Sequence, residues 1–152
     1  MFLGKGGNFS ANNSDIIKFQ ARVNQNNYVK LERLSILYLI RHTFNHQSYF
    51  TKLEKLREFP FLSDLTLTGD YHQLLNFWII SCDILYLDKE IVQYDLSGAT
   101  VGSEINNIIR TERIRSSLLV ARNSYSFSAL IIALIQIFIY SPLLYSNLNS
   151  VI

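Results

Sequence analysis

The chain has 152 residues, a formal net charge of +2 and a single cysteine. This length suits one small domain, and one cysteine excludes an intramolecular disulfide. Nucleic-acid-binding proteins usually carry a clustered basic patch, whereas the basic residues here are spread along the chain. Composition and charge therefore argue against a nucleic-acid partner.

The first part of the chain divides into a polar terminus and a helical body. Residues 1–14 are rich in Gly, Asn and Ser, which predicts a disordered or extended N-terminus. Residues 15–122 are expected to form the body. Within it, apolar residues at helical spacing predict a helix from Tyr28 to His46 and another from Ser48 to Glu58.

Two more helices are expected in the second half of the body. Asp70 is placed to act as the N-cap of a helix that runs to about Gln93. Its centre, residues 74–87, is apolar on nearly every side, but it is short for a bilayer span and contains Asp83. A buried or interfacial helix fits this stretch better. Ser103 is expected to begin a further helix that leads into the C-terminal segment.

The last 30 residues contain no charged side chain. As a helix, residues 124–145 would extend about 30 Å, the thickness of the hydrocarbon core of a bilayer. We therefore expect a transmembrane helix at 124–145, followed by a short tail at 146–152. The predicted fold is mostly α-helical: a small helical body with one C-terminal transmembrane helix. The alternative is a helix buried in a large protein core.

Four arginines precede the predicted span, and no Lys or Arg follows it. Because positive residues stay on the cytoplasmic side of a membrane, this asymmetry places the N-terminal body on the cytoplasmic or matrix side. The same side chains are suited to contact anionic lipid headgroups. The four residues are Arg110, Arg113, Arg115 and Arg122.

One face of the predicted span is less apolar than the rest. Ala129, Ala133, Gln136 and Tyr140 are spaced by four, three and four residues, so they line up along a helix. Small residues allow close helix packing, and an amide in hydrocarbon needs a hydrogen-bonding partner. We therefore expect this face to pack against a neighbouring transmembrane helix. Chance spacing in a lipid-facing helix is the alternative.

No pattern in the sequence identifies a reaction. His42 and His46 have the spacing of a zinc-binding pair, but the glutamate of the metalloprotease motif is absent, and four ligands would require His72 and Cys82. Surface histidines are the preferred interpretation. Asp83 among apolar residues suggests a perturbed carboxylate on a proton path, although a solvent-facing position is more common. We predict no catalytic, cofactor-binding or metal-binding residue.

The functional expectation follows from location and composition. The body carries more apolar residues than a small domain hides, which indicates contact with other proteins or with a membrane. Abundant Ile, Asn, Phe and Tyr, all with AT-rich codons, suggest an organellar or viral gene. We expect a non-catalytic accessory subunit of a membrane complex in the mitochondrial inner membrane, either a respiratory complex or the ATP synthase, with other subunits and the lipid bilayer as partners. The alternatives are a tail-anchored adaptor or viral membrane protein, and an organellar ribosomal protein.

Overall fold

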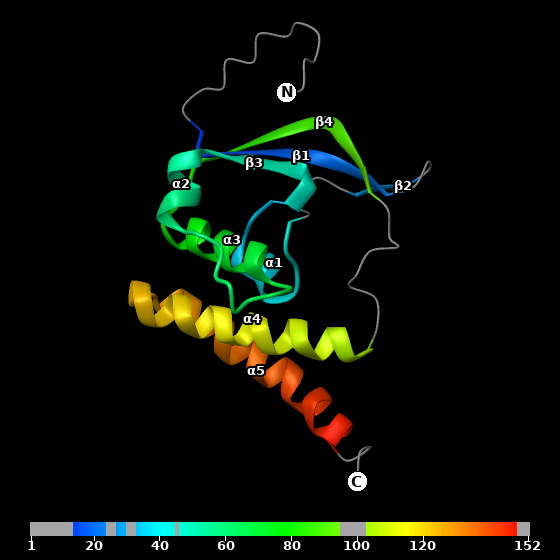
Figure 1. Ribbon diagram of the computed structural model, residues 1–152, viewed down its shortest axis with the longest axis vertical. Coiled ribbons are helices and arrows are strands. Elements are labelled where there is room, and N and C mark those ends of the chain that lie inside the picture. Colours follow the sequence, from blue (N-terminus) through cyan, green and yellow to red (C-terminus); the bar gives the residue numbers. More distant parts are fainter. Residues whose placement is uncertain (1–13, 24–26, 30–32, 45, 95–102, 149–152) are drawn as a thin grey trace, which may run out of the picture.

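The computed structural model describes residues 14–23, 27–29, 33–44, 46–94 and 103–148, and they form a mixed α/β fold (Figure 1). The expectation of a mostly α-helical body is wrong, because four segments of the body are strands. Of the predicted N-terminal segment, residues 1–13 lie outside the described residues. The elements in chain order are β1 (Ile16–Val23), β2 (Asn27–Val29), α1 (Ile36–Arg41), the short 3-10 helix η1 (His46–Ser48), β3 (Tyr49–Thr51), α2 (Leu53–Glu58), α3 (Gly69–Ile79), β4 (Ile84–Tyr94), α4 (Ser103–Ser124) and α5 (Phe127–Leu148).

The sheet is built around β1. β4 runs parallel to β1 along its whole length, with Ile16 opposite Ile84. β2 and β3 are antiparallel to β1 and pair with its C-terminal and N-terminal halves respectively. Since β4 occupies one edge of β1, the two short strands share the other edge.

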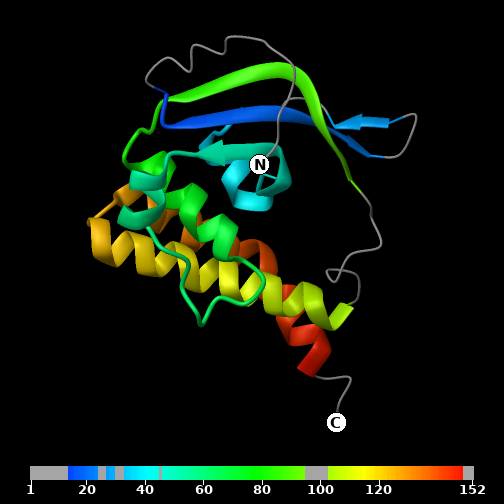
Figure 2. The same ribbon diagram turned by 45° about the horizontal axis from the view of Figure 1, so that its top comes forward.

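The helices form two layers beneath the sheet. Figures 1 and 2 both show α1 and α3 between the sheet and the long α4–α5 pair. The core runs through these layers. Its fully or almost fully buried side chains come from β1, α1, the segment after α1, α3, α4 and α5: Ile16, Leu39, Ile40, Phe44, Tyr71, Leu74, Leu75, Phe77, Val120, Ala129 and Ile132.

The helix predicted from Asp70 to Gln93 ends much earlier, at Ile79. Ser81 has a left-handed backbone conformation with φ 55°, and the N–H groups of Ser81 and Cys82 donate to the carbonyls of Trp78 and Phe77. These paired bonds form a Schellman motif, which terminates a helix. The apolar run that follows becomes β4. Its periodicity alone does not separate a buried strand from a buried helix, and pairing with β1 decides the outcome.

The predicted transmembrane helix is also wrong, and with it the expected integral membrane location. Within the described part of the chain, no helix combines the length and the apolar character needed to cross a bilayer. The uncharged C-terminal segment instead forms α5, which folds back against α4. Tyr125, with φ 51°, ends α4, and Ser126 accepts a hydrogen bond from the Ala129 N–H to cap α5. α5 continues past Pro142 to Leu148, so Pro142 does not end it.

Candidate functional site in the α4–α5 layer

The inner face of α5 carries small and polar side chains. Ala129, Ala133 and Gln136 are fully buried, and Tyr140 is 9% exposed. These are the residues expected to contact a neighbouring transmembrane helix. The structure instead brings them together inside the chain, where α5 packs mainly on α4 and α1 and more lightly on α3. Because alanine side chains are small, the two alanines on this face allow α5 to approach its neighbouring helices closely.

A closed ring of three hydrogen bonds lies at the centre of this interface. The Ser117 hydroxyl donates to Gln136 Oε1 at 2.9 Å, and Gln136 Nε2 donates to the Tyr71 hydroxyl oxygen at 2.9 Å. The remaining 3.1 Å contact joins Tyr71 to Ser117, so the Tyr71 hydroxyl must donate to Ser117. Gln136 Nε2 also donates to the Ile40 carbonyl at 3.2 Å. The ring thereby connects α1, α3, α4 and α5.

The predicted lipid-facing arginines lie along α4, and three of them contact the protein itself. The Arg110 guanidinium is 5.7 Å from the ring centroid of Tyr140, and that of Arg113 is 5.2 Å from the ring of Tyr71. Arg113 also donates to the Arg41 carbonyl. The remaining two are exposed on the surface: Arg115 pairs with Asp64, and Arg122 lies in the last turn of α4.

Glu112 fixes the loop before α3 onto α4. One carboxylate oxygen accepts from the N–H and the hydroxyl of Thr66 at 3.0 and 2.8 Å, and the other from the Leu67 N–H and the Thr68 hydroxyl at 2.9 and 3.1 Å. Burial by itself would raise the pKa of Glu112, but these four hydrogen bonds outweigh it and hold the pKa below its ordinary value. The carboxylate is therefore a fixed structural acceptor.

His72 belongs to the same interface rather than to a metal site. Its Nδ1 lies 2.8 Å from the buried hydroxyl of Ser116. Burial lowers the pKa of His72, and the Asp64 carboxylate offsets only part of that effect. The ring is thus neutral at pH 7 and serves as a hydrogen-bonding group between α3 and α4.

The other candidates for chemistry are dispersed. His42 is exposed beyond the end of α1, and the side chain of His46 lies outside the described side chains. Asp83 is exposed at the start of β4 and accepts from the Ser14 hydroxyl at 3.0 Å. Burial and the Asp15 carboxylate raise the pKa of Cys82 to about 11, so its thiol is protonated at neutral pH. Among the described residues, no cluster of His, Cys, Asp and Glu is arranged to hold a metal ion.

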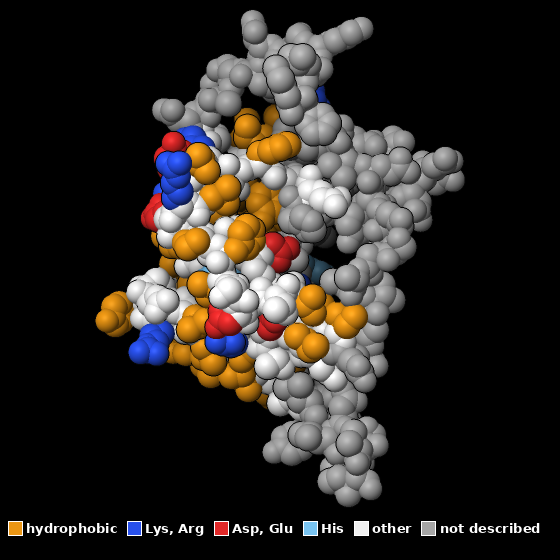
Figure 3. All heavy atoms as spheres, viewed as in Figure 1, with side chains coloured by type: hydrophobic (Ala, Val, Ile, Leu, Met, Phe, Trp, Pro, Cys, Tyr) orange, Lys and Arg blue, Asp and Glu red, His pale blue; other side chains and the backbone are white. Residues whose placement is uncertain are grey.

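The outer face of α5 exposes several large apolar residues. Phe127 is 73% exposed, Leu134 55% and Phe138 81%, and Leu130 and Ile137 are also exposed. At 100° per residue these positions fall within about 100° of the helix circumference, opposite the buried face. We call this set the outer stripe: Phe127, Leu130, Leu134, Ile137 and Phe138. Figure 3 shows hydrophobic side chains gathered along the lower edge of the α4–α5 layer.

Sequence reasoning missed the outer stripe, although its signal was present. The spacing that aligned Ala129, Ala133 and Gln136 also aligns the large residues on the opposite side of the helix. Lipid covers such a face in a transmembrane helix. Under the expectation of a membrane span, these apolar residues therefore did not indicate a protein interface. No pattern in the sequence indicates the role of Glu112, because its hydrogen-bonding partners lie 44 to 46 residues earlier in the chain.

Comparison with known proteins leaves the site to be interpreted on its geometry alone. No family model, curated protein or solved structure matches this chain.

Proposed function

We propose that this protein is a non-catalytic subunit of a multi-protein assembly, which it joins by docking the outer stripe of α5 onto an apolar, uncharged surface of a partner protein. The proposal keeps the subunit role expected from the sequence. It does not include the membrane anchor on which the mitochondrial inner-membrane complex and the tail-anchored adaptor both depended.

The observation that carries the proposal is the exposed apolar face of α5. A helix on the surface of a monomer normally turns polar residues outward. Here Gln136 is buried with the two alanines and Ile132, while two phenylalanines are more than 70% exposed. Covering the outer stripe would contribute on the order of 5 kcal/mol before the entropic costs of association. An exposed apolar face of this kind typically marks a protein interface.

The chemistry of the outer stripe specifies its partner. No residue of α5 is charged, so nothing on this helix would pair with an ionic surface or with phosphates. From Phe127 to Phe138 the outer stripe is about 17 Å long, which matches three turns of a helix lying along it. We therefore specify the occupant as an apolar helix of a different protein, packed by the ordinary fit of side-chain ridges into grooves.

The buried polar groups support a structural role over a catalytic one. Tyr71, Ser117 and Gln136 satisfy one another, His72 bonds to Ser116, and the four acceptor contacts of Glu112 hold a loop in place. A catalytic group must be within reach of a substrate. These groups are buried in the helical layers.

The test compares two leucines, one inside the outer stripe and one outside it. Leu134 is 55% exposed on α5, and Leu37 is 77% exposed on α1. In extracts of the source organism under native conditions, the protein should migrate well above its own mass of 17.6 kDa. Leu134→Ser should shift it to the monomer position without lowering its melting temperature. Leu37→Ser should leave the migration unchanged.

A photo-reactive amino acid at position 138 identifies the occupant. It should form one adduct with a single different protein, and the same probe at position 37 should not form that adduct. Adducts of twice the chain mass would mean that a second copy covers the outer stripe and would overturn the proposed occupant. Migration that collapses after nuclease treatment would instead support the ribosomal alternative. If the protein migrates as a monomer in the extract, the proposal that it is a subunit of an assembly is wrong.

A further inference from the structure

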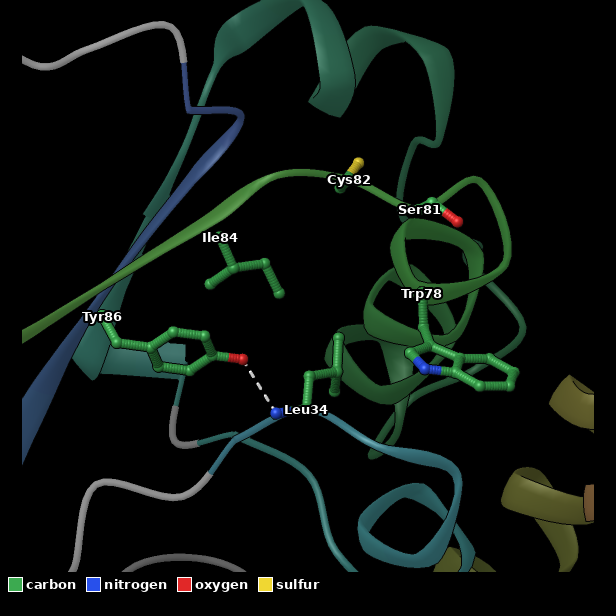
Figure 4. A pocket seen from close by; sticks show the side chains of 6 residues that line it. All are labelled: Leu34, Trp78, Ser81, Cys82, Ile84 and Tyr86. Carbon is green, nitrogen blue, oxygen red and sulfur yellow. Dashed lines mark hydrogen bonds between the residues drawn. The ribbon is translucent and has the colours of Figure 1, made fainter.

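A pocket of about 300 Å³ opens between the start of β4 and the end of α3 (Figure 4). It is remote from the outer stripe, since the α1–α3 layer separates the sheet from α5 in Figures 1 and 2. Its volume is at the lower end of the range for small-molecule sites. The six lining residues come from three parts of the chain: Leu34, Trp78, Ser81, Cys82, Ile84 and Tyr86.

The walls of the pocket are mostly apolar and aromatic. Ile84 and Tyr86 are two residues apart on β4, so both side chains project from the same face of the strand. In Figure 4 they face Leu34, the Trp78 indole lies on the far side of Leu34, and the Cys82 sulfur points away from Ile84 and Tyr86. Two aromatic rings and two aliphatic side chains favour a planar apolar group, because flat rings pack well against such walls.

The Tyr86 end of the pocket offers a hydrogen-bond donor. The Tyr86 hydroxyl oxygen accepts from the Leu34 N–H at 2.8 Å. Among the described residues, none accepts a hydrogen bond from this hydroxyl. Burial raises the pKa of Tyr86, although the Leu34 N–H and Arg33 act in the opposite direction, so the hydroxyl stays protonated at neutral pH.

The charges around the pocket are unequal at its two ends. The Arg33 guanidinium lies 5.9 Å from the centroid of the Tyr86 ring. At the other end, the Asp15 carboxylate is close enough to Cys82 to raise the pKa of its thiol. An anionic group is therefore favoured beside Tyr86 and disfavoured beside Cys82.

We propose that this pocket binds a small aromatic carboxylate, with its ring between Trp78, Leu34 and Ile84 and its carboxylate accepting a hydrogen bond from the Tyr86 hydroxyl beside Arg33. This ligand site goes beyond the proposed docking function and does not depend on it. A planar ring fills the apolar walls, and an oxygen anion satisfies both the Tyr86 donor and the positive charge.

Trp78 makes the site directly observable, because it is the single tryptophan of the chain. The full-length protein labelled with ¹⁵N has one indole N–H cross-peak, and its fluorescence comes from a residue that lines the pocket. Titration with sodium benzoate should shift this cross-peak and saturate. Benzamide, which is neutral, and cyclohexanecarboxylate, which is not planar, should each bind several-fold more weakly.

Two variants test the polar end. Tyr86→Phe keeps the ring but removes the donor, and benzoate affinity should fall about tenfold. Because this change also leaves the Leu34 N–H without its acceptor, Arg33→Gln provides a second test on an exposed residue. It should weaken benzoate several-fold and leave benzamide unchanged. Tyr125→Phe, at a 94% exposed position in the α4–α5 turn, is the matched control and should bind as the parent does.

Several results would overturn the proposal. A Trp78 cross-peak that does not move up to the solubility limit of benzoate would mean that the pocket does not bind this class of ligand. Equal affinities for benzoate and benzamide, or an Arg33→Gln protein that binds benzoate as tightly as the parent, would remove the carboxylate from the assignment.

Discussion

Gln136 is the residue at which four helices meet. Its amide contacts Ser117 on α4, Tyr71 on α3 and the Ile40 carbonyl on α1. A buried polar group is costly unless it is hydrogen-bonded, and the hydrogen bonds of Gln136 reach three other helices. The side chain that suggested helix packing in a bilayer therefore organises the interior of this protein.

Removing the amide should be strongly destabilising. Gln136→Leu keeps a similar volume but removes the acceptor of the buried Ser117 hydroxyl. It also removes one of the two contacts of the Tyr71 hydroxyl and one donor to the Ile40 carbonyl, which keep Ser117 and Tyr140 as partners. An unsatisfied buried group costs about 1–3 kcal/mol, so we expect the free energy of unfolding to fall by about 1–3 kcal/mol. Urea denaturation followed by circular dichroism measures this change.

The closed ring also predicts non-additivity. In a double-mutant cycle, Gln136→Leu and Ser117→Ala together should cost clearly less than the sum of the two single variants, because either one already opens the ring. Additive effects would mean that the three bonds act independently. Thr111→Ala, at an exposed position on α4, provides a control that should leave stability almost unchanged.

At the scale of elements, two turns decide the course of the chain. The turns that follow α3 and α4 each contain a non-glycine residue with positive φ, Ser81 and Tyr125 respectively. Each is followed by a bond back to the preceding turn: Cys82 N–H to the Phe77 carbonyl at 2.9 Å and Ser126 N–H to the Ala121 carbonyl at 3.2 Å. Without these stops, the apolar stretches would continue as the longer helices expected from the sequence.

Glycine should improve the first of these turns. The left-handed conformation is unfavourable for a residue with a Cβ, so Ser81→Gly should raise the free energy of unfolding by up to about 1 kcal/mol. Ser81→Val should lower it by more, since a β-branched side chain is strained at this φ. Thermal unfolding measures both variants. An equal melting temperature for all three proteins would show that the turn is held by its surroundings rather than by local backbone preference.

Across the whole molecule, the neutral state of His72 should make stability depend on pH. Its folded pKa lies below the ordinary value of about 6.5, so between the two values the unfolded chain binds more protons than the folded one. The contribution of His72 is complete above about pH 6.5 and is lost as the pH falls towards the folded pKa. The free energy of unfolding should therefore decline as the pH falls below about 6.5.

The His72→Gln variant isolates this effect. It should flatten the decline over that range, whereas removal of an exposed histidine in His42→Gln should leave it in place. Glu112 acts in a separate window: its pKa is held below its ordinary value of 4.5, so its stabilisation is lost only at lower pH. An unchanged slope in His72→Gln would assign the decline to other groups.

Local features of the fold could be predicted from the sequence. A helix was expected to begin at Ser103, and α4 begins there. The helix expected from Ser48 to Glu58 ends where α2 ends, but its first part is the strand β3. Of the helix expected from Tyr28 to His46, only Ile36–Arg41 is helical. Alignment of Ala129, Ala133, Gln136 and Tyr140 on one face also followed from helical spacing. These predictions depend on residues within a few turns of one another, where capping and periodicity act directly.

The strands could not be recognised in the same way. β1 and β4 pair across 68 residues, counting from Ile16 to Ile84, and Asp15 and Ile16 donate to the Asp83 carbonyl over the same separation. An apolar run such as 84–87 suits a helix or a buried strand equally well until its partner is known. The sheet therefore could not be predicted from local residue spacing.

By itself, the sequence determined that the C-terminal segment is uncharged and helical and that its small and polar residues share one face. Only the tertiary structure decided that this face is buried by α1, α3 and α4, and that the outer stripe is exposed. The physical reason is that spacing sets which residues share a face, whereas the surroundings set which face is covered. The hydrogen-bonding partners of the buried Gln136 amide are far from it in the sequence, so local spacing does not reveal them.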